Sequence, residues 1–278
     1  MVRNNRVGTI LTHALLITGV AIMCLPIWLT FVGSTVTQQD IVRPPLPILP
    51  GGHLIENYRN ALFSGGNAPV ARMLWNSTVM ALGIAIGKIV ISLLSAFAIV
   101  YFRFPGRMLC FWTIFITLML PVEVRIVPTY EIAVKLGLLN SYSGLILPLI
   151  ASATATFLFR QFFMTIPNEL VEAARMDGAG PMRFFKDILL PLSITNIAAL
   201  FVILFIYGWN QFLWPLLVTT DPDMNTIVMG IKQMLPQADD YGNWPMAMAT
   251  AILAILPPVV VVLAMQRLFV KGLVESEK

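Results

Sequence analysis

At 278 residues, with 58% hydrophobic and only 12% charged residues and a mean hydropathy of +0.81, the chain is far more apolar than a soluble domain, in which about 25% of residues are charged. This composition predicts an all-α polytopic membrane protein, because the length holds six spans of about 20 residues and little else. The two cysteines and two histidines are isolated, and no catalytic motif is present. We therefore expect no metal site, no catalytic residue, no enzyme activity in this chain and no nucleic-acid partner.

Six apolar stretches are the expected transmembrane helices. The first resembles a signal peptide, but its length and the lack of a small-residue cleavage site favour a retained span. A long external loop follows it, with an ordered short helix near residues 54–62. Asn76-Ser77 is a possible helix cap for the second span, and Pro257-Pro258 predicts a kink in the sixth. The expected spans cover residues 10–32, 75–101, 109–127, 144–163, 192–218 and 246–270.

The basic residues predict the orientation of these spans. Cytoplasmic loops carry an excess of Lys and Arg, and a model with the N-terminus inside places most of the basic residues on that side. Both termini and the polar loop between the fourth and fifth spans are then cytoplasmic. The basic residues on the inside are Arg3, Arg6, Arg103, Arg107, Arg160, Arg175, Arg183, Lys186, Arg267, Lys271 and Lys278.

The polar loop between the fourth and fifth spans predicts two short helices joined by a tight turn. Leu170, Ala173, Ala174 and Asp177 share one face of the first helix. Gly178 is suited to the left-handed conformation that ends a helix. Gly180-Pro181 is suited to the start of a second helix, which should carry Met182, Phe185 and Leu189 inward.

The spacing of this loop resembles the EAA loop of ABC-importer permeases. Glu172, Ala173, Ala174 and Gly178 match the first half of the motif, and Ile188, Leu190 and Pro191 match the second. The resemblance implies a cytoplasmic coupling helix that docks on an ATP-binding subunit, with Glu172, Ala173, Ala174, Asp177 and Gly178 as the coupling residues. The alternative is an ordinary surface hairpin, in which Glu172 is a solvated charge beside Arg175.

The resemblance extends over most of the chain. From about residue 75 onward the sequence is similar to the carbohydrate-type, maltose-permease-like importers, and more closely to the second permease subunits of sn-glycerol-3-phosphate importers. The segments that carry this likeness cover residues 115–125, 157–163, 207–215 and 272–278. The resemblance implies a type I ABC importer permease that moves glycerol-3-phosphate across the bacterial inner membrane by alternating access.

The same resemblance implies the partners and the domain plan. The partners are the lipid bilayer, a homologous second permease, two ATP-binding subunits and a periplasmic substrate-binding protein. ATP and Mg are expected on the ATP-binding partner, with no cofactor in this chain. Residues 1–74 form the first helix and its external loop, residues 75–271 the five-helix core with its coupling loop at 168–188, and residues 272–278 a cytoplasmic tail.

Three alternatives stay open. An ABC permease for an oligosaccharide or a glycerophosphodiester has the same architecture. An ion-coupled secondary transporter should carry several ionisable residues near the midplane, where Lys88 is the one clear case. A membrane-embedded enzyme would need a catalytic cluster that the sequence lacks.

An anionic substrate needs a cation and hydrogen-bond donors along its pathway. Lys88 is the candidate within the second span, and Arg125 the candidate at the outer end of the third, unless it pairs with Glu123 or Glu131. The remaining candidates for the substrate pathway belong to the polar and aromatic part of the fifth span and are Tyr207, Asn210, Gln211 and Trp214.

Overall fold

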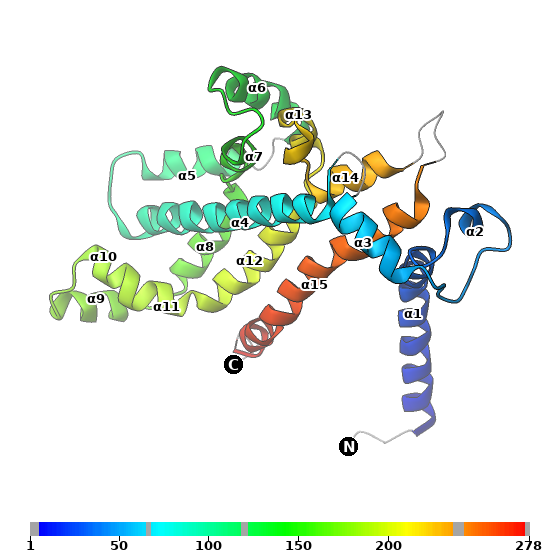
Figure 1. Ribbon diagram of the computed structural model, residues 1–278. Coiled ribbons are helices and arrows are strands. Elements are labelled where there is room, and N and C mark those ends of the chain that lie inside the picture. Colours follow the sequence, from blue (N-terminus) through cyan, green and yellow to red (C-terminus); the bar gives the residue numbers. More distant parts are fainter. Residues whose placement is uncertain (1–5, 65–67, 118–121, 236–241, 276–278) are drawn as a thin grey trace. The chain divides into compact units, whose positions relative to one another are not determined.

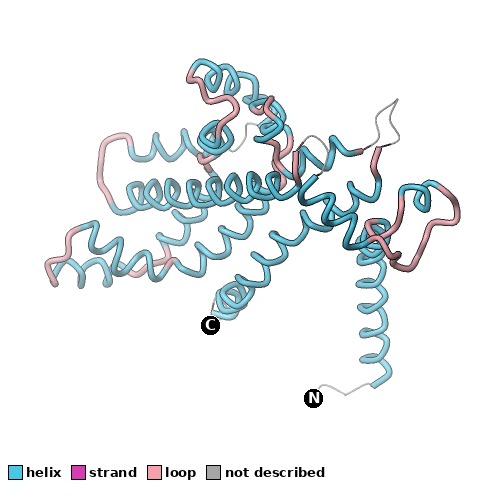
Figure 2. The backbone as a smooth tube through the Cα atoms, in the orientation of Figure 1, coloured by secondary structure: helices cyan, strands magenta, loops and turns pink. Residues whose placement is uncertain are grey.

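The computed structural model describes residues 6–64, 68–117, 122–235 and 242–275, and within these ranges it contains helices and loops but no strand (Figures 1 and 2). The all-α prediction is therefore confirmed. The longer helices are α1 (Arg6–Gly33), α3 (Leu54–Ser64), α4 (Val70–Tyr101), α5 (Arg107–Ile116), α6 (Val122–Lys135), α8 (Ala153–Met164), α12 (Ile194–Trp209) and α15 (Trp244–Glu275). The shorter elements are α2 (Gln38–Val42), α7 (Tyr142–Ile146), η2 (Leu147–Leu149), α9 (Asn168–Met176), α10 (Pro181–Phe184), η3 (Phe185–Leu189), α11 (Leu190–Leu192), α13 (Leu213–Val218), η4 (Pro222–Met224) and α14 (Ile227–Met234).

The chain divides into two compact units. The first comprises Met1–Arg72 and Gly230–Leu256, and the second comprises Met73–Met229 and Pro257–Lys278. One boundary falls at Pro257, within α15, which continues as a helix through Pro257 and Pro258. The candidate sites lie in the second unit.

Three described helices are long and apolar enough to cross a membrane: Gly8–Gly33, Val70–Tyr101 and Trp244–Gln266. Two further pairs of helices pass the same test together, which gives up to five spans among the described residues. The expected third span is the exception. It consists of the 10-residue α5 and, after residues 118–121, of α6, which extends to Lys135. Pro121, one of the two prolines in this stretch, lies outside the described residues.

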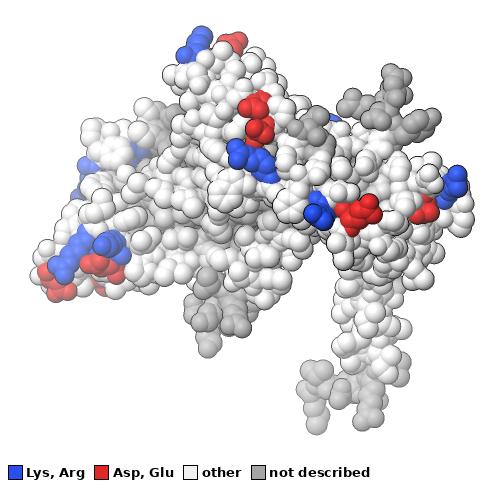
Figure 3. All heavy atoms as spheres, viewed as in Figure 1, with Lys and Arg blue, Asp and Glu red and all other residues white. Residues whose placement is uncertain are grey.

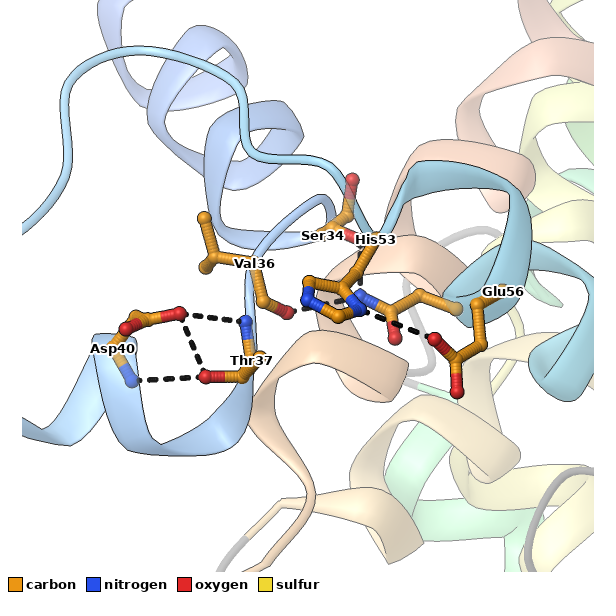
Figure 4. Close-up of polar contacts among 7 residues, drawn as sticks. Ser34, Val36, Thr37, Asp40, His53 and Glu56 are labelled. Carbon is orange, nitrogen blue, oxygen red and sulfur yellow. Dashed lines mark hydrogen bonds and ion pairs between the residues drawn. The ribbon is translucent and has the colours of Figure 1, made fainter.

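The loop between α1 and α4, which was expected to be external, is ordered by polar contacts. The helix expected near residues 54–62 is α3, and the sequence analysis missed α2. Thr37 Oγ1 donates to Asp40 Oδ2 at 2.6 Å and accepts from the Asp40 backbone N–H at 3.3 Å, which caps the start of α2 (Figure 4). His53 Nδ1 lies 3.1 Å from Glu56 Oε2 at the start of α3. The loop is therefore a folded segment and not a simple tether.

The expected fourth span is a bent pair and not one continuous helix. The segment Tyr142–Leu149 meets α8 at an angle of 50°. Ser152 ends the break, because its side chain accepts a hydrogen bond from the Ala155 N–H and caps α8. The bend places Ile146 and Ile150 against α4. A Cβ added at Gly83 would lie 2.6 Å from the Ile146 side chain, and one added at Gly87 would lie 2.6 Å from the Ile150 side chain. The two glycines therefore allow the bent segment to pack closely against α4.

The expected fifth span is also interrupted. Helix α12 ends at Trp209, and α13 begins after a break at residues 210–212. Pro215 explains the break, because it has no N–H to donate to the Gln211 carbonyl and its ring would clash with that carbonyl in a continuous helix. Before α12, the segment Pro181–Leu192 is bent from it by 71°.

The expected cap at Asn76-Ser77 is wrong, because α4 begins six residues earlier, at Val70. Both side chains are buried and tie α4 to the loop before α14. Asn76 Nδ2 donates to the Asp223 and Asn225 carbonyls at 2.8 and 2.9 Å, and Ser77 Oγ accepts from the Ile227 N–H at 2.8 Å. Buried amide and hydroxyl groups are retained where they satisfy such backbone groups.

Asn140 links the loop after α6 to the loop after α13. Its backbone has a φ of 52°, a conformation that asparagine tolerates better than most residues. Its Oδ1 accepts from the Thr220 and Asp221 N–H groups at 2.7 and 3.0 Å, and its N–H donates to the Val218 carbonyl at 2.9 Å. These bonds fix α6 and α13 relative to one another.

Candidate functional site

The loop that was expected to couple to an ATPase is a helical hairpin, and its glycines explain the turn. Gly178 has a φ of 71°, as expected for the residue that ends α9. The Ala179 N–H donates to the Ala174 carbonyl at 2.8 Å, and the Gly178 N–H donates to the Arg175 carbonyl at 3.0 Å. This pair of bonds is a Schellman motif, which satisfies carbonyls at the helix end. Pro181 then occupies the first position of α10, as predicted.

The residues expected to couple to an ATPase lie on the surface of the hairpin. Glu172, Ala173, Asp177 and Gly178 are exposed, while Ala174 is 5% exposed. Met176, at the end of α9, is 83% exposed. Figures 1 and 3 show α9 and α10 at one end of the second unit, where acidic and basic side chains gather on a surface that is otherwise largely uncharged. A charged surface with exposed small and apolar residues suits docking of a protein partner.

Aromatic contacts fix the hairpin to the end of α4. The Phe184 ring lies 5.3 Å from the Tyr101 ring, and the Phe185 ring lies 4.9 Å from the Phe97 ring. Aromatic pairs of this kind contribute about 0.5–1.5 kcal/mol each beyond the area that they bury. These rings are therefore a direct packing contact between the hairpin and α4.

The prediction that Met182 points inward is wrong, because it is 65% exposed. Phe184 and Leu189 are the buried residues, and Phe185 is half-buried. The reason is the π-helical turn η3, in which each turn contains an additional residue. Phe184 and Leu189, five positions apart, therefore share the buried face. Regular α-helical spacing could not reveal this shift.

Four of the six substrate-pathway candidates line one small cavity of about 90 Å³ in the second unit. The cavity is built by α4, α6, the segment between α7 and α8, the end of α12, and α13. Its lining residues are Lys88, Arg125, Ile126, Thr129, Pro148, Leu149, Ala151, Tyr207 and Trp214. The cavity therefore brings Lys88, Arg125, Tyr207 and Trp214 together from segments that are distant in sequence.

Lys88 is 6% exposed and lies within a helix that is apolar enough to span a membrane. Its Nζ lies 3.7 Å from the centroid of the Tyr207 ring. A desolvated cation–π contact is worth about 2 kcal/mol. An intramembrane lysine costs about 2.5–3.5 kcal/mol on insertion scales. The ring offsets most of that cost, but it supplies no negative charge.

Arg125 lies in the first turns of α6 and is exposed, with its side chain at the edge of the cavity. Of its two expected pairing partners, Glu131 makes no ion pair with it, and the Glu123 side chain lies outside the described residues. None of the described lining residues is acidic. The cavity thus combines two cations with no described counter-charge.

Asn210 and Gln211 do not line this cavity. Asn210 is the exposed residue that follows the last turn of α12, and Gln211 Nε2 donates to the Tyr207 carbonyl at 3.1 Å. Both lie in the break between α12 and α13, so neither projects from a continuous fifth span as expected.

The residues that close the cavity were not predicted from the sequence. Pro148, Leu149 and Ala151 line it because the expected fourth span is bent. The Trp214 Nε1–H donates to the Gly144 carbonyl at 3.1 Å. This bond holds the indole ring in place as part of the cavity wall. The available signal was Pro148, an imino acid in a stretch that was otherwise read as one helix.

Comparison with known proteins places these features in a family. Residues 88–275 match the family model described as "Binding-protein-dependent transport system inner membrane component". This region contains the hairpin and every lining residue of the cavity.

Curated relatives align with the chain over its whole length. The chain is 62% identical to the sn-glycerol-3-phosphate transport system permease protein UgpE of Brucella melitensis and 63% identical to that of Agrobacterium fabrum, with 100% of each chain covered. A solved bacterial ABC transporter that imports the acidic polysaccharide alginate has the same fold, with a TM-score of 0.81, 19% identity, and coverage of 96% of this chain and 98% of that one. This chain therefore belongs to the family of inner membrane components of binding-protein-dependent transport systems.

Proposed function

We propose that this chain is the permease subunit through which an ATP-driven importer moves sn-glycerol-3-phosphate into the cell. The names of the full-length relatives support the choice of substrate, because identity above 60% extends over both candidate sites. The cavity supports it independently, since two cations on a transmembrane pathway suit an anion better than a neutral sugar.

The proposed coupling to ATP hydrolysis is supported by the exposed surface of the hairpin. Glu172, Ala173 and Gly178 are exposed on α9 and its turn, while the rings behind them are packed onto α4. In this proposal an ATP-binding subunit binds the exposed face of the hairpin. Movement of that subunit then shifts α4, against which the other face of the hairpin packs. Closure of the ATPase dimer would switch the permease between inward-facing and outward-facing states.

The assembly that fits this role contains a second, homologous permease, two ATP-binding subunits and a periplasmic binding protein. ATP and Mg bind to the ATP-binding subunits. This chain transmits their conformational change and forms part of the substrate pathway. Both termini and the hairpin face the cytoplasm, and the loop that contains α2 and α3 faces the periplasm. The region 75–271 is the transport core, residues 1–74 add the first helix and its loop, and residues 272–278 form the tail.

The test is uptake by cells. Deletion of the gene for this chain should abolish binding-protein-dependent uptake of labelled glycerol-3-phosphate, and a plasmid copy should restore it. Excess unlabelled glycerol-3-phosphate should compete, whereas an oligosaccharide should not. Unchanged uptake in the deletion strain, or competition by the oligosaccharide alone, would assign the permease to another solute. Competition by a glycerophosphodiester at equal concentration would widen the substrate class.

A further inference from the structure

Some hydrogen-bond donors in the cavity around Lys88 are already used within the protein, and others could bind a ligand. The Trp214 Nε1–H is committed to the Gly144 carbonyl, and the Thr129 hydroxyl donates to the Arg125 carbonyl at 2.7 Å. Lys88 and Arg125 therefore bring the cationic donors, with three and five N–H groups respectively. Both are groups that bind the oxygens of a phosphate.

Among the described residues that line the cavity, the charges are unbalanced. Lys88 and Arg125 line the same cavity, and the Lys88 ammonium lies over the face of the neutral Tyr207 ring. Two like charges beside a low-dielectric wall favour the arrival of an anion between them. A buried cation in a membrane helix is seldom kept without such a role.

The cavity is small. Its volume of about 90 Å³ suits a compact oxyanion. Ile126, Pro148 and Leu149 provide the apolar part of the wall, which would exclude further polar groups. The space beside the two cations thus suits the anionic end of a substrate.

We propose that this cavity is a phosphoryl subsite of the transport pathway, in which Lys88 and Arg125 bind the oxygens of a phosphomonoester while the glycerol part lies outside it. The proposal rests on the function proposed above. Its specificity follows from charge. A phosphomonoester carries about −1.5 to −2 at neutral pH, which matches two cations, whereas a phosphodiester carries a single negative charge.

Tyr207 has a second part in this subsite. Its ring holds Lys88 in place while the cavity is empty, and the ammonium turns its N–H groups to the phosphate when the anion enters. Since the cation lies over the face of the ring, Tyr207→Leu, which removes the ring, should reduce transport.

The experiment uses the complete importer in proteoliposomes, with ATP inside and binding protein loaded with labelled glycerol-3-phosphate outside. Lys88→Met, which keeps the length but removes the charge, and Arg125→Gln should each lower the initial uptake rate by roughly tenfold or more, as expected for the loss of a charge-assisted hydrogen bond. Lys88→Arg is the matched control and should retain most of the rate. Co-purification of the partner subunits checks assembly.

A charge-rescue measurement covers the case in which Lys88→Met fails to assemble. In a chain with Cys24 and Cys110 replaced by serine, Arg125→Cys should lose uptake. Modification with a cationic aminoethyl thiol reagent should restore uptake, and a neutral methyl reagent should not. Restoration by both reagents, or by neither, would overturn the subsite.

The outcomes separate the two proposals. If the unmodified importer does not take up glycerol-3-phosphate, the proposed function is wrong. If it does, and both Lys88→Met and Arg125→Gln transport at the unmodified rate, the function stands and the phosphate is recognised elsewhere.

Discussion

The coupling hairpin and the Lys88 cavity belong to the same compact unit, but they are built in opposite ways. The hairpin is one continuous segment, and it exposes the side chains that we assign to coupling, among them Glu172. The cavity is assembled from several separate segments, and its central side chain, Lys88, is buried. A surface for a protein partner can be local, whereas a site inside a helical bundle depends on every helix that surrounds it.

This difference predicts how each region responds to substitution. In the hairpin, a change should act through the turn or through the docked surface, and it should leave the bundle intact. Around the cavity, a change in helix packing should disturb the site even when no lining residue is altered.

Gly178→Leu should reduce uptake to background while the protein stays in the membrane. A side chain at a φ of 71° costs about 1–2 kcal/mol in the left-handed conformation, and the turn would reopen to avoid it. The measurement is uptake together with membrane content. Gly180→Ala is the control, because Gly180 has a φ of −70° and open space around it. Equal uptake by both variants would show that the shape of the turn does not matter for coupling.

Glu172→Lys should lower uptake by roughly tenfold or more, because inversion of a charge in a docking surface opposes the basic partner residue that we infer. The measurement is the amount of ATP-binding subunit that co-purifies with the permease, together with uptake. Asp187→Lys makes the same change of charge elsewhere in the loop, where Asp187 lies 3.4 Å from Arg183 in an exposed ion pair, and it should have little effect. A reversed order of the two variants would place the docking surface on the other helix.

Gly208→Ala should disturb the cavity without touching its lining. A Cβ at Gly208 would lie 2.9 Å from the Ala81 Cα, so α12 must move away from α4 and carry Tyr207 away from Lys88. Overpacking of this kind costs about 1–3 kcal/mol. We expect a fall in the melting temperature of the purified complex and a partial loss of uptake. Gly19→Ala, in α1, has nothing within 4 Å of the added carbon and should change neither.

The smallest effect concerns the loop that contains α2 and depends on pH. Hydrogen bonds from the Thr37 side chain and backbone lower the pKa of Asp40. A carboxyl group with a lowered pKa in the folded state stabilises the fold above its unfolded pKa, and this stabilisation is lost as pH falls through the folded value. Hydrogen exchange of the α2 amides should therefore speed up on acidification beyond the intrinsic rate. Asp40→Asn should remove this pH dependence, and a dependence that persists would exclude the carboxylate as its source.

The sequence predicted the hairpin well because its signals are local. Gly178, Gly180 and Pro181 specify the turn and the next helix start by their own backbone preferences. The register beyond Phe184 was missed, because a π-helical turn depends on how Phe184 and Leu189 pack and not on local spacing.

The cavity was predictable only in part. Lys88 stood out as a lone cation in an apolar stretch, and the aromatic content near Tyr207 and Trp214 was visible. The break at residues 210–212 and the bend after η2 were not expected, although Pro215 and Pro148 mark them. Asn210 was therefore placed on a continuous helix, and the wall formed by residues 148–151 was missed. Tertiary packing decides whether a proline bends a span or interrupts it, and single-sequence patterns do not contain that information.

The most direct test of the account is ATP-driven accumulation in proteoliposomes that contain the assembled importer. With ATP inside and loaded binding protein outside, labelled glycerol-3-phosphate should accumulate above its external concentration. Accumulation should stop when this chain is omitted, when ATP is replaced by a non-hydrolysable analogue, or when the chain carries Gly178→Leu. Accumulation that persists without this chain, or without ATP hydrolysis, would contradict the assignment of the chain as the permease that couples ATP to transport.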